Sequence, residues 1–279
     1  MTTKKKEQAK VVSQEQLADG IFSMWIQTEA AGSARPGQFI SMYTNDGSKL
    51  LPRPISICEI DKEGGKLRVV YRVTGEKTGT EEFSQMKAGD TIPVIGPLGN
   101  GFPFEKAEGK KVFLMGGGIG VPPILELAKQ MECEKKQIVV GYRDAHTFLK
   151  EEFEQAGELY ISTEDGSVGT KGNVMDAIRE NALEADMIYA CGPTPESSVI
   201  SHWKREWHAE SVHVLRACAS QRKRMRTAMC TTNVSVKTDR YFFLRRWKSN
   251  GYACKYCRSR MEESGNSGIR NLRIRRRVF

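Results

Sequence analysis

Hydrophobic and polar positions alternate with a short period in the first third of the chain. Runs rich in β-branched and aromatic residues lie at 38–43, 55–58, 66–73 and 91–95, and Gly, Asn and Asp separate them. Such alternation, with a turn about every ten residues, is typical of antiparallel strands that close into a barrel. We therefore expect an antiparallel β-barrel over residues 1–102.

The pattern changes near residue 110. A buried-strand run is followed by a Gly-rich turn and then by apolar residues at helical spacing. Strands alternating with helices predict an open parallel sheet, and we expect an α/β domain over residues 103–195. The candidate strands lie at 111–115, 137–142, 159–163 and 187–191, and the candidate helices at 122–131, 147–156 and 173–183.

The charge of the chain is distributed unevenly. The net charge is +9, but residues 196–279 contain 20 of the 43 Lys and Arg residues and only 6 of the 34 Asp and Glu residues. The first two thirds are therefore mildly acidic, and we treat 196–279 as an anomalous, irregular basic tail. If the parallel sheet ends with the strand at 187–191, that strand is an uncovered edge, which predicts reduced stability or aggregation.

Hydropathy gives no sign of a membrane segment. No apolar run reaches the roughly 18 to 20 residues that span a bilayer, and the basic start of the chain leads into no signal-peptide core. We expect a cytoplasmic protein.

The first candidate site is Arg53-Pro54-Ile55-Ser56 on a barrel strand. An arginine fork can bind a pyrophosphate through two hydrogen bonds, and a serine hydroxyl can donate to a ring nitrogen. The alternative is a surface arginine beside an edge-strand proline.

A second candidate lies on the next barrel strand and the turn after it. Tyr71 offers a ring, Arg72 a second phosphate fork, and the backbone amides of Gly79 and Thr80 can meet a phosphate. The alternative is a twisted strand that ends in a polar turn.

The third candidate, Gly116-Gly117-Gly118-Ile119-Gly120, follows a strand and opens a helix. Amides at a helix start favour a pyrophosphate, although Val121 stands where the dinucleotide fingerprint has its third glycine. The alternative is a Gly-rich turn without a ligand.

The fourth candidate, Cys191-Gly192-Pro193, follows the last strand of the expected sheet. Ligands of open α/β sheets bind at this carboxyl edge, where a thiol can pack on a nicotinamide ring. A buried strand-end cysteine is the alternative.

The motifs follow one another along residues 10–195 in the order Arg-Pro-x-Ser, Gly-Pro-Leu-Gly (96–99), Gly-Gly-Gly-Ile-Gly-Val-Pro-Pro and Cys-Gly-Pro. This series resembles the ferredoxin-NADP reductase superfamily. Within it, the doubled proline after the glycine turn and the Cys-Gly-Pro-Thr-Pro segment resemble the electron-transfer subunits of NAD-dependent dihydroorotate dehydrogenase. The resemblance implies FAD on the barrel, at Arg53, Pro54, Ile55, Ser56, Val70, Tyr71, Arg72, Gly79 and Thr80. It implies NAD(H) at Gly116, Gly117, Gly118, Ile119, Gly120, Cys191, Gly192 and Pro193.

The resemblance also implies a function in pyrimidine biosynthesis, with no catalytic side chain of its own. Electrons would pass from an FMN-containing catalytic subunit, in a heterotetramer, through a 2Fe-2S cluster to FAD and then to NAD⁺. Asp144 suits a ribose hydroxyl and Arg143 suits a 2′-phosphate, so NAD and NADP both stay open.

The cluster ligands that the family implies are missing from the tail. The family pattern is Cys-x4-Cys-x2-Cys and a distant Cys, whereas this chain has Cys218, Cys230, Cys254 and Cys257. We assign no metal ligand. Reading the possible codons of the tail two nucleotides later permits Leu-Glu-Glu-Arg-Met-Ala-Cys-Gly-Ile-Gly-Ala-Cys, which resembles the family's cluster-binding end. The hypothesis is that the tail is a frame-shifted translation.

Two other functions are consistent with the sequence. The chain could be a different NAD(P)H oxidoreductase of the ferredoxin-reductase type that works without a cluster. It could also be a nucleic-acid-binding protein on a degenerate flavoprotein scaffold, since basic runs in the tail can meet phosphates. No known nucleic-acid motif organises those runs, which disfavours the second alternative.

Overall fold

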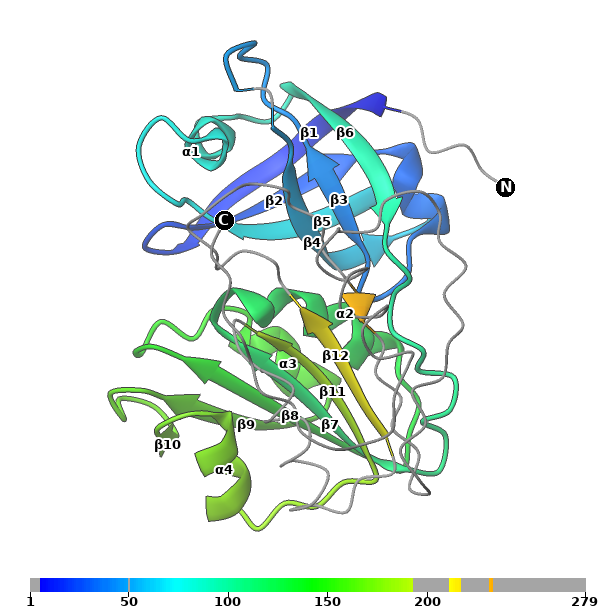
Figure 1. Ribbon diagram of the computed structural model, residues 1–279, viewed down its shortest axis with the longest axis vertical. Coiled ribbons are helices and arrows are strands. Elements are labelled where there is room, and N and C mark those ends of the chain that lie inside the picture. The colour runs from blue at the N-terminus through cyan, green and yellow to red at the C-terminus, as the bar shows by residue number, and fades with distance from the viewer. Residues whose placement is uncertain (1–5, 50, 193–210, 217–230, 233–279) are drawn as a thin grey trace, which may run out of the picture.

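Two bodies of secondary structure lie one above the other in the computed structural model, which describes residues 6–49, 51–192, 211–216 and 231–232 (Figure 1). The upper body is a barrel and the lower body is a sheet with helices on both faces. We call them the barrel and the sheet body.

Six antiparallel strands close the barrel in the order β1-β2-β5-β4-β3-β6, as the short-period alternation predicts. A 3₁₀ helix follows β2, and a short α-helix precedes β6. The elements are β1 (Lys6–Ala18), β2 (Ile21–Gln27), η1 (Glu29–Ser33), β3 (Phe39–Met42), β4 (Arg53–Asp61), β5 (Lys66–Arg72), α1 (Gly79–Ser84) and β6 (Thr91–Leu98).

The sheet body is an open sheet in the order β10-β9-β8-β7-β11-β12-β13, and all pairs except β12 with β13 are parallel. The predicted α/β class is therefore confirmed. The elements are β7 (Lys111–Gly117), η2 (Gly118–Gly120), α2 (Pro122–Gln130), β8 (Lys135–Tyr142), α3 (Lys150–Ala156), β9 (Glu158–Thr163), β10 (Thr170–Lys171), α4 (Val174–Glu180), β11 (Met187–Gly192), β12 (Ser211–Arg216) and β13 (Thr231–Thr232).

Each face of the sheet has its own helices, because alternate residues of a strand point to opposite faces. Leu114 and Tyr189 belong to the buried cluster that includes α2 and α3, whereas Phe113 and Ile188 belong to the cluster that includes α4. Helix α2 begins at a pair of prolines, which suit the first helical turn.

The prediction that β11 is the uncovered edge of the sheet is wrong. Strand β12 lies parallel to β11 over six register positions, from Met187 opposite Ser211 to Gly192 opposite Arg216. The basic composition of the tail obscured a short segment, Ser211–Arg216, that includes two β-branched valines. Its pairing satisfies backbone groups that an edge strand would leave exposed.

The barrel and the sheet body share one apolar core. Ile21 on β2, Cys58 on β4 and Val70 on β5 point out of the barrel and belong to the same buried cluster as Leu125 on α2. Strand β5 is consequently buried on both sides, with Leu67 and Val69 pointing into the barrel. This shared core holds the barrel against the sheet body.

Candidate functional site

The arginine of the first motif lies against the start of helix α1. A Cβ atom built on Gly79 would come 3.0 Å from Arg53 Nε and 2.9 Å from the side chain of Thr44, so a larger residue there would displace these side chains. Arg53 also donates to the backbone carbonyl of Leu51. The structure therefore brings Arg53 together with Gly79, two predicted flavin residues that are 26 positions apart in the sequence.

The turn that precedes α1 closes around Thr80. Its Oγ1 accepts a hydrogen bond of 3.2 Å from the Thr74 amide and lies 3.1 Å from Thr78 Oγ1, while Thr78 caps the helix by accepting from Glu81 N. Thr80 is buried. The Thr80 hydroxyl therefore stabilises the turn through its own hydrogen bonds. A phosphate at this turn would bind to the backbone amides and not to this hydroxyl.

The remaining residues of the first motif follow Arg53 on β4. Pro54 and Ile55 are opposite Ser41 and Ile40 of β3, and Ser56 is opposite Phe39. Each of the three is half-buried. A ligand at this strand would therefore contact residues whose backbone is held in place by pairing with β3.

Strand β5, which carries the second candidate site, has fewer side chains available to a ligand than the sequence predicts. The Tyr71 ring is buried in the barrel, its hydroxyl donates to Gln14 Oε1 over 2.8 Å, and burial raises the pKa of that phenol. Val70 is buried at the junction with the sheet body, whereas Arg72 is exposed at the end of β5. Because β5 runs antiparallel to β4, its end lies beside the start of β4.

The glycine-rich turn fits tightly against the end of β11. A Cβ on Gly120 would come 2.7 Å from Gly192 Cα and would also collide with the Cys191 backbone, and one on Gly116 would come 2.8 Å from Val121 Cα. Gly118 has φ +53° and nothing within 4 Å of its Cβ position. The turn is closed toward the sheet and open at Gly118, as an amide cradle for a pyrophosphate requires.

The fourth motif forms the other wall of this cradle. Cys191 is buried, and burial raises the pKa of its thiol to about 12, so the sulfur stays protonated. A Cβ on Gly192 would be 3.6 Å from Gly117 N, and Ile119 packs against the adjoining core. The structure thus joins the third and fourth motifs, while Pro193 lies outside the described residues.

An acidic rim lies beyond the cradle, where β8 and β9 end. Asp144 Oδ1 accepts from the backbone of His146 over 2.9 Å, and this bond, with one to the His146 ring, lowers the pKa of the carboxyl. Asp165 is held in the same way by Ser167, which lowers its pKa too. Two ionised carboxylates at this rim suit a ribose hydroxyl better than a 2′-phosphate.

Sequence reasoning missed a group of charged residues where α2 meets the barrel. Arg68 on β5 and Glu126 on α2 are both buried, and they occur inside apolar runs. A charge at an apolar position of a strand or helix is the signal that would have identified them, since such residues are buried only with partners.

The described residues contain no group of three or more His, Cys, Asp or Glu side chains that could hold a metal ion. Cys58, Cys133 and Cys191 are free thiols, and Cys218, Cys230, Cys254 and Cys257 lie outside the described ranges. The described residues therefore do not fit an iron-sulfur cluster. Among those residues, too, the helices are all too short or too polar to cross a bilayer.

Comparison with curated proteins finds relatives that are electron transfer subunits. The electron transfer subunit of dihydroorotate dehydrogenase B (NAD(+)) from Bacillus caldolyticus is 42% identical over 196 residues, which are 68% of this chain and 76% of the relative. The same subunit from Streptococcus mutans is 43% identical over 193 residues, covering 67% and 73% of the two chains. No protein-family model matches the chain.

Solved structures share the arrangement of barrel and sheet. The NADH-dependent reduced ferredoxin-NADP oxidoreductase, described for flavin-based electron bifurcation, superposes with a TM-score of 0.64 at 31% identity, over 74% of this chain and 75% of that one. A ferredoxin NADP⁺ reductase from Neisseria gonorrhoeae with bound FAD and NADP gives 0.63 over 76% and 98%. Its identity of 14% shows likeness of fold alone.

Proposed function

The chain belongs to the family of dihydroorotate dehydrogenase B electron transfer subunits, and from that premise we propose that it is an electron-transfer flavoprotein that binds FAD and NAD(H). FAD occupies the barrel (residues 1–102), along Arg53–Ser56, the Val70–Arg72 backbone and the turn at Gly79 and Thr80. NAD(H) occupies the sheet body (residues 103–195), between the Gly116–Gly120 turn and Cys191–Pro193.

One observation supports the proposal most strongly. The two candidate nucleotide sites begin two elements that pack on each other, since β4 starts with Arg53 and α2 starts just after Gly120, and Cys58 of β4 shares a buried cluster with Leu125 of α2. Each site also has a closely packed glycine, Gly79 against the Thr44 and Arg53 side chains and Gly120 against the Cys191–Gly192 backbone. Two dinucleotides held by such adjoining elements would have their reactive rings side by side.

The residues of this chain would bind and orient the cofactors, and the cofactors would carry the redox chemistry. When bound, FAD supplies two-electron exchange with a nicotinamide and one-electron exchange with other carriers. The Arg53 guanidinium neutralises the pyrophosphate of FAD, and the amides around Gly118 bind the pyrophosphate of NAD(H). The protonated Cys191 thiol is an uncharged surface on which the nicotinamide ring can pack. The ionised Asp144 favours NAD(H) over NADP(H) at this site.

The natural electron source of this family is a dihydroorotate dehydrogenase catalytic subunit, and we propose an FMN-containing subunit of that kind as the partner in pyrimidine biosynthesis. The cysteines that a cluster would need are absent from the reading frame, so transfer from the partner is impaired in this chain. Sequencing the coding DNA across codons 190–205 in independent clones tests the frameshift. An intact frame in every clone would reject it.

A visible spectrum of the full chain tests the flavin site. After incubation with excess FAD and gel filtration, we expect a yellow protein with about one FAD per chain, no iron-sulfur absorbance, and bleaching by NADH without oxygen. A folded but colourless chain would contradict the proposal. A basic nucleic-acid-binding protein on a degenerate scaffold predicts that result, whereas a cluster-free NAD(P)H oxidoreductase predicts the flavin without any binding of the catalytic subunit.

A further inference from the structure

The two elements that begin with the cofactor motifs are joined to each other at their opposite ends. Strand β4 begins at Arg53 and carries Glu59 and Ile60 near its end, while α2 begins at Pro122 and carries Glu126 at its middle and Lys129 near its end. The joining residues therefore lie away from both nucleotide sites.

Direct contacts between side chains and backbone make this joint. Glu126 Oε2 accepts from Ile60 N over 2.8 Å, and Lys129 Nζ forms an ion pair with Glu59. Arg68 Nη1 donates to Glu59 Oε2 over 2.6 Å and to Glu152 Oε1 of α3 over 3.2 Å. We call this set the junction clamp; its members are Glu59, Ile60 and Arg68 of the barrel and Glu126, Lys129 and Glu152 of the sheet body.

The clamp is more buried than an ordinary surface network. The side chains of Arg68 and Glu59 are 8% and 13% exposed. Burial opposes the ionisation of Glu59, yet its bonds with Lys129 and Arg68 outweigh burial and lower its pKa. A third bond holds the Arg68 Nε on Ser23 Oγ at 2.8 Å. Because buried charges are stable only while their partners stay in place, the clamp resists sliding of α2 over the barrel.

Small movements at the clamp would displace the two cofactor sites, because the same strand and helix connect them to the clamp. Ser56 and Ile60 are four positions apart on β4, about 13 Å of strand. Pro122, where α2 begins, and Glu126 are four positions apart along α2, about 6 Å of helix. A rotation at the clamp would therefore move the flavin and nicotinamide sites relative to each other. A displacement of about 1 Å can slow a reaction about 100-fold.

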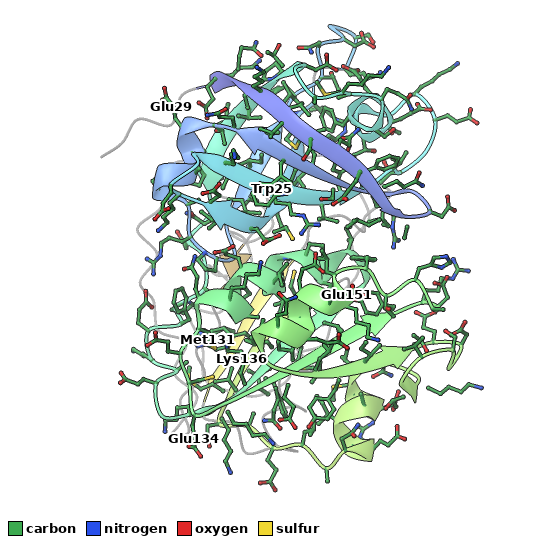
Figure 2. All side chains as sticks on the ribbon, turned by 180° about the vertical axis from the view of Figure 1, so that it is seen from behind. Trp25, Glu29, Met131, Glu134, Lys136 and Glu151 are labelled. Carbon is green, nitrogen blue, oxygen red and sulfur yellow. The ribbon has the colours of Figure 1, made fainter. Side chains whose placement is uncertain are left out.

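Figure 2 shows the same junction from behind, where the labelled Glu151 of α3 lies on the side of the sheet body that faces the barrel. Glu151 and Glu152 line a cleft of about 360 Å³ with Glu15 and Arg68 of the barrel. The ion pair of Arg68 with Glu152 thus spans a cleft between the two bodies.

We propose that Arg68, Lys129 and Glu152 are positioning residues that set the distance between the flavin and nicotinamide rings. This inference rests on the proposed function. In the step concerned, NADH gives a hydride, with both electrons of the C4–H bond, to oxidised FAD, and NAD⁺ and the reduced flavin anion result.

The test compares two double variants of the full chain that preserve its net charge. Lys129→Met with Glu152→Gln removes the two ion pairs of the junction clamp that join the bodies, Lys129 with Glu59 and Glu152 with Arg68. The control, Lys135→Met with Glu15→Gln, also removes two ion pairs, each within one body. Lys135 pairs with Glu158 at 3.2 Å inside the sheet body, and Glu15 contacts the same Arg68 at 3.3 Å inside the barrel.

Flavin reduction by NADH, cofactor binding and thermal unfolding are measured for each variant. In anaerobic mixing with saturating NADH, we expect the clamp variant to reduce its FAD about tenfold more slowly than the control, with a weaker long-wavelength charge-transfer band. We expect its FAD content and NADH affinity to be unchanged. Calorimetry of the cofactor-free chain should show two separated transitions in the clamp variant and one in the control. Equal rates, bands and transitions in the two variants would overturn the proposal.

Milder variants and the cofactor-free chain make every outcome informative. If the clamp double variant does not fold, Glu152→Gln is compared with Glu15→Gln, and equal flavin reduction rates would overturn the clamp. If the unmodified chain binds no FAD, the proposed function fails, while calorimetry still decides whether the clamp couples the two bodies.

Discussion

The carboxylate of Glu126 on helix α2 accepts a hydrogen bond of 2.8 Å from the backbone amide of Ile60 on barrel strand β4. Glu126 is 5% exposed, and burial raises the pKa of its carboxyl. Gln130 is its second partner, so its charge has no cation in direct contact among the residues described. The bond joins the barrel to the sheet body at a cost in desolvation.

The Glu126→Gln variant is therefore expected to be more stable at neutral pH. A carboxyl group whose pKa is raised by folding contributes stability at low pH and loses it as the pH rises through the raised value. An amide can still accept from Ile60, so we expect the Tm advantage of the variant to grow from about pH 4 to pH 7 and reach about 2–4 °C. Thermal melts over this range measure it.

Glu158→Gln is the matched control for this prediction. Hydrogen bonds from Tyr160 and Lys135 lower the pKa of Glu158, so its contribution to stability is present at neutral pH and lost as the pH falls. We expect the Tm difference of this variant to have the opposite sign. A Glu126→Gln curve parallel to that of the unmodified chain would contradict the conclusion that burial raises the pKa of Glu126.

Replacing Gly120 by alanine should disrupt the nucleotide cradle. The new methyl group would collide with backbone atoms of Cys191 and Gly192, which cannot rotate away as a side chain does. We expect a loss of about 1–3 kcal/mol in unfolding free energy and at least about tenfold weaker binding of NADH. Gly32→Ala, where nothing lies within 4 Å, is the control. NADH affinity equal in the two variants would exclude the turn from the nucleotide site.

Flavin retention should depend on Arg53. Its guanidinium lies against Gly79, where the turn amides can share a pyrophosphate. We expect Arg53→Leu to weaken FAD binding at least about tenfold, measured as quenching of flavin fluorescence. Arg35→Leu removes an arginine that pairs with exposed Glu105 and should retain FAD. Full retention by Arg53→Leu would place the flavin elsewhere.

Discrimination against NADPH should depend on Asp144. The His146 backbone bond lowers the pKa of this carboxyl, so it is ionised at neutral pH and repels a 2′-phosphate. We expect Asp144→Asn to improve NADPH affinity up to about fivefold while NADH affinity changes little. Asp46→Asn is a close match, since Asp46 Oδ1 accepts from Ser48 N two residues on at the same 2.9 Å. An unchanged NADPH affinity would remove Asp144 from the ribose site.

Periodicity predicted the barrel and the parallel sheet because both depend on local patterns. The order of the motifs also predicted which ones meet, and Gly120 does contact the Cys191–Gly192 backbone. The direction of Tyr71 could not be predicted. Since β5 is buried on both faces, its residues show no alternation that would separate the barrel interior from the junction.

The junction clamp escaped prediction for a different reason. Glu126 occupies an apolar helix and Arg68 an apolar strand, and their partners Ile60 and Glu152 are 66 and 84 positions away. No local pattern encodes such a pairing. Strand β12 was missed because the composition of the whole tail concealed six residues that can pair with β11.

A histidine on β12 should make the stability of the chain depend on pH in the acidic range. His213 of β12 stacks on Tyr189 of β11 with centroids 4.9 Å apart and ring planes 20° apart. It is 5% exposed, and its Nδ1 has no hydrogen-bond partner among the described residues. Burial, with a smaller effect of Lys106, lowers its pKa from 6.5 to about 4.

A histidine that folding holds neutral binds its proton more readily in the unfolded chain. Stability should therefore fall as the pH drops from 6.5 toward 4, by at most about 3 kcal/mol. His213→Phe retains the stacking but cannot titrate, so we expect urea unfolding of this variant to show a shallower loss over that range. His146→Phe, at an exposed loop position, should behave like the unmodified chain. If His213→Phe loses stability as steeply as the control, β12 does not bury this ring against Tyr189, and the edge of the sheet at β11 is open after all.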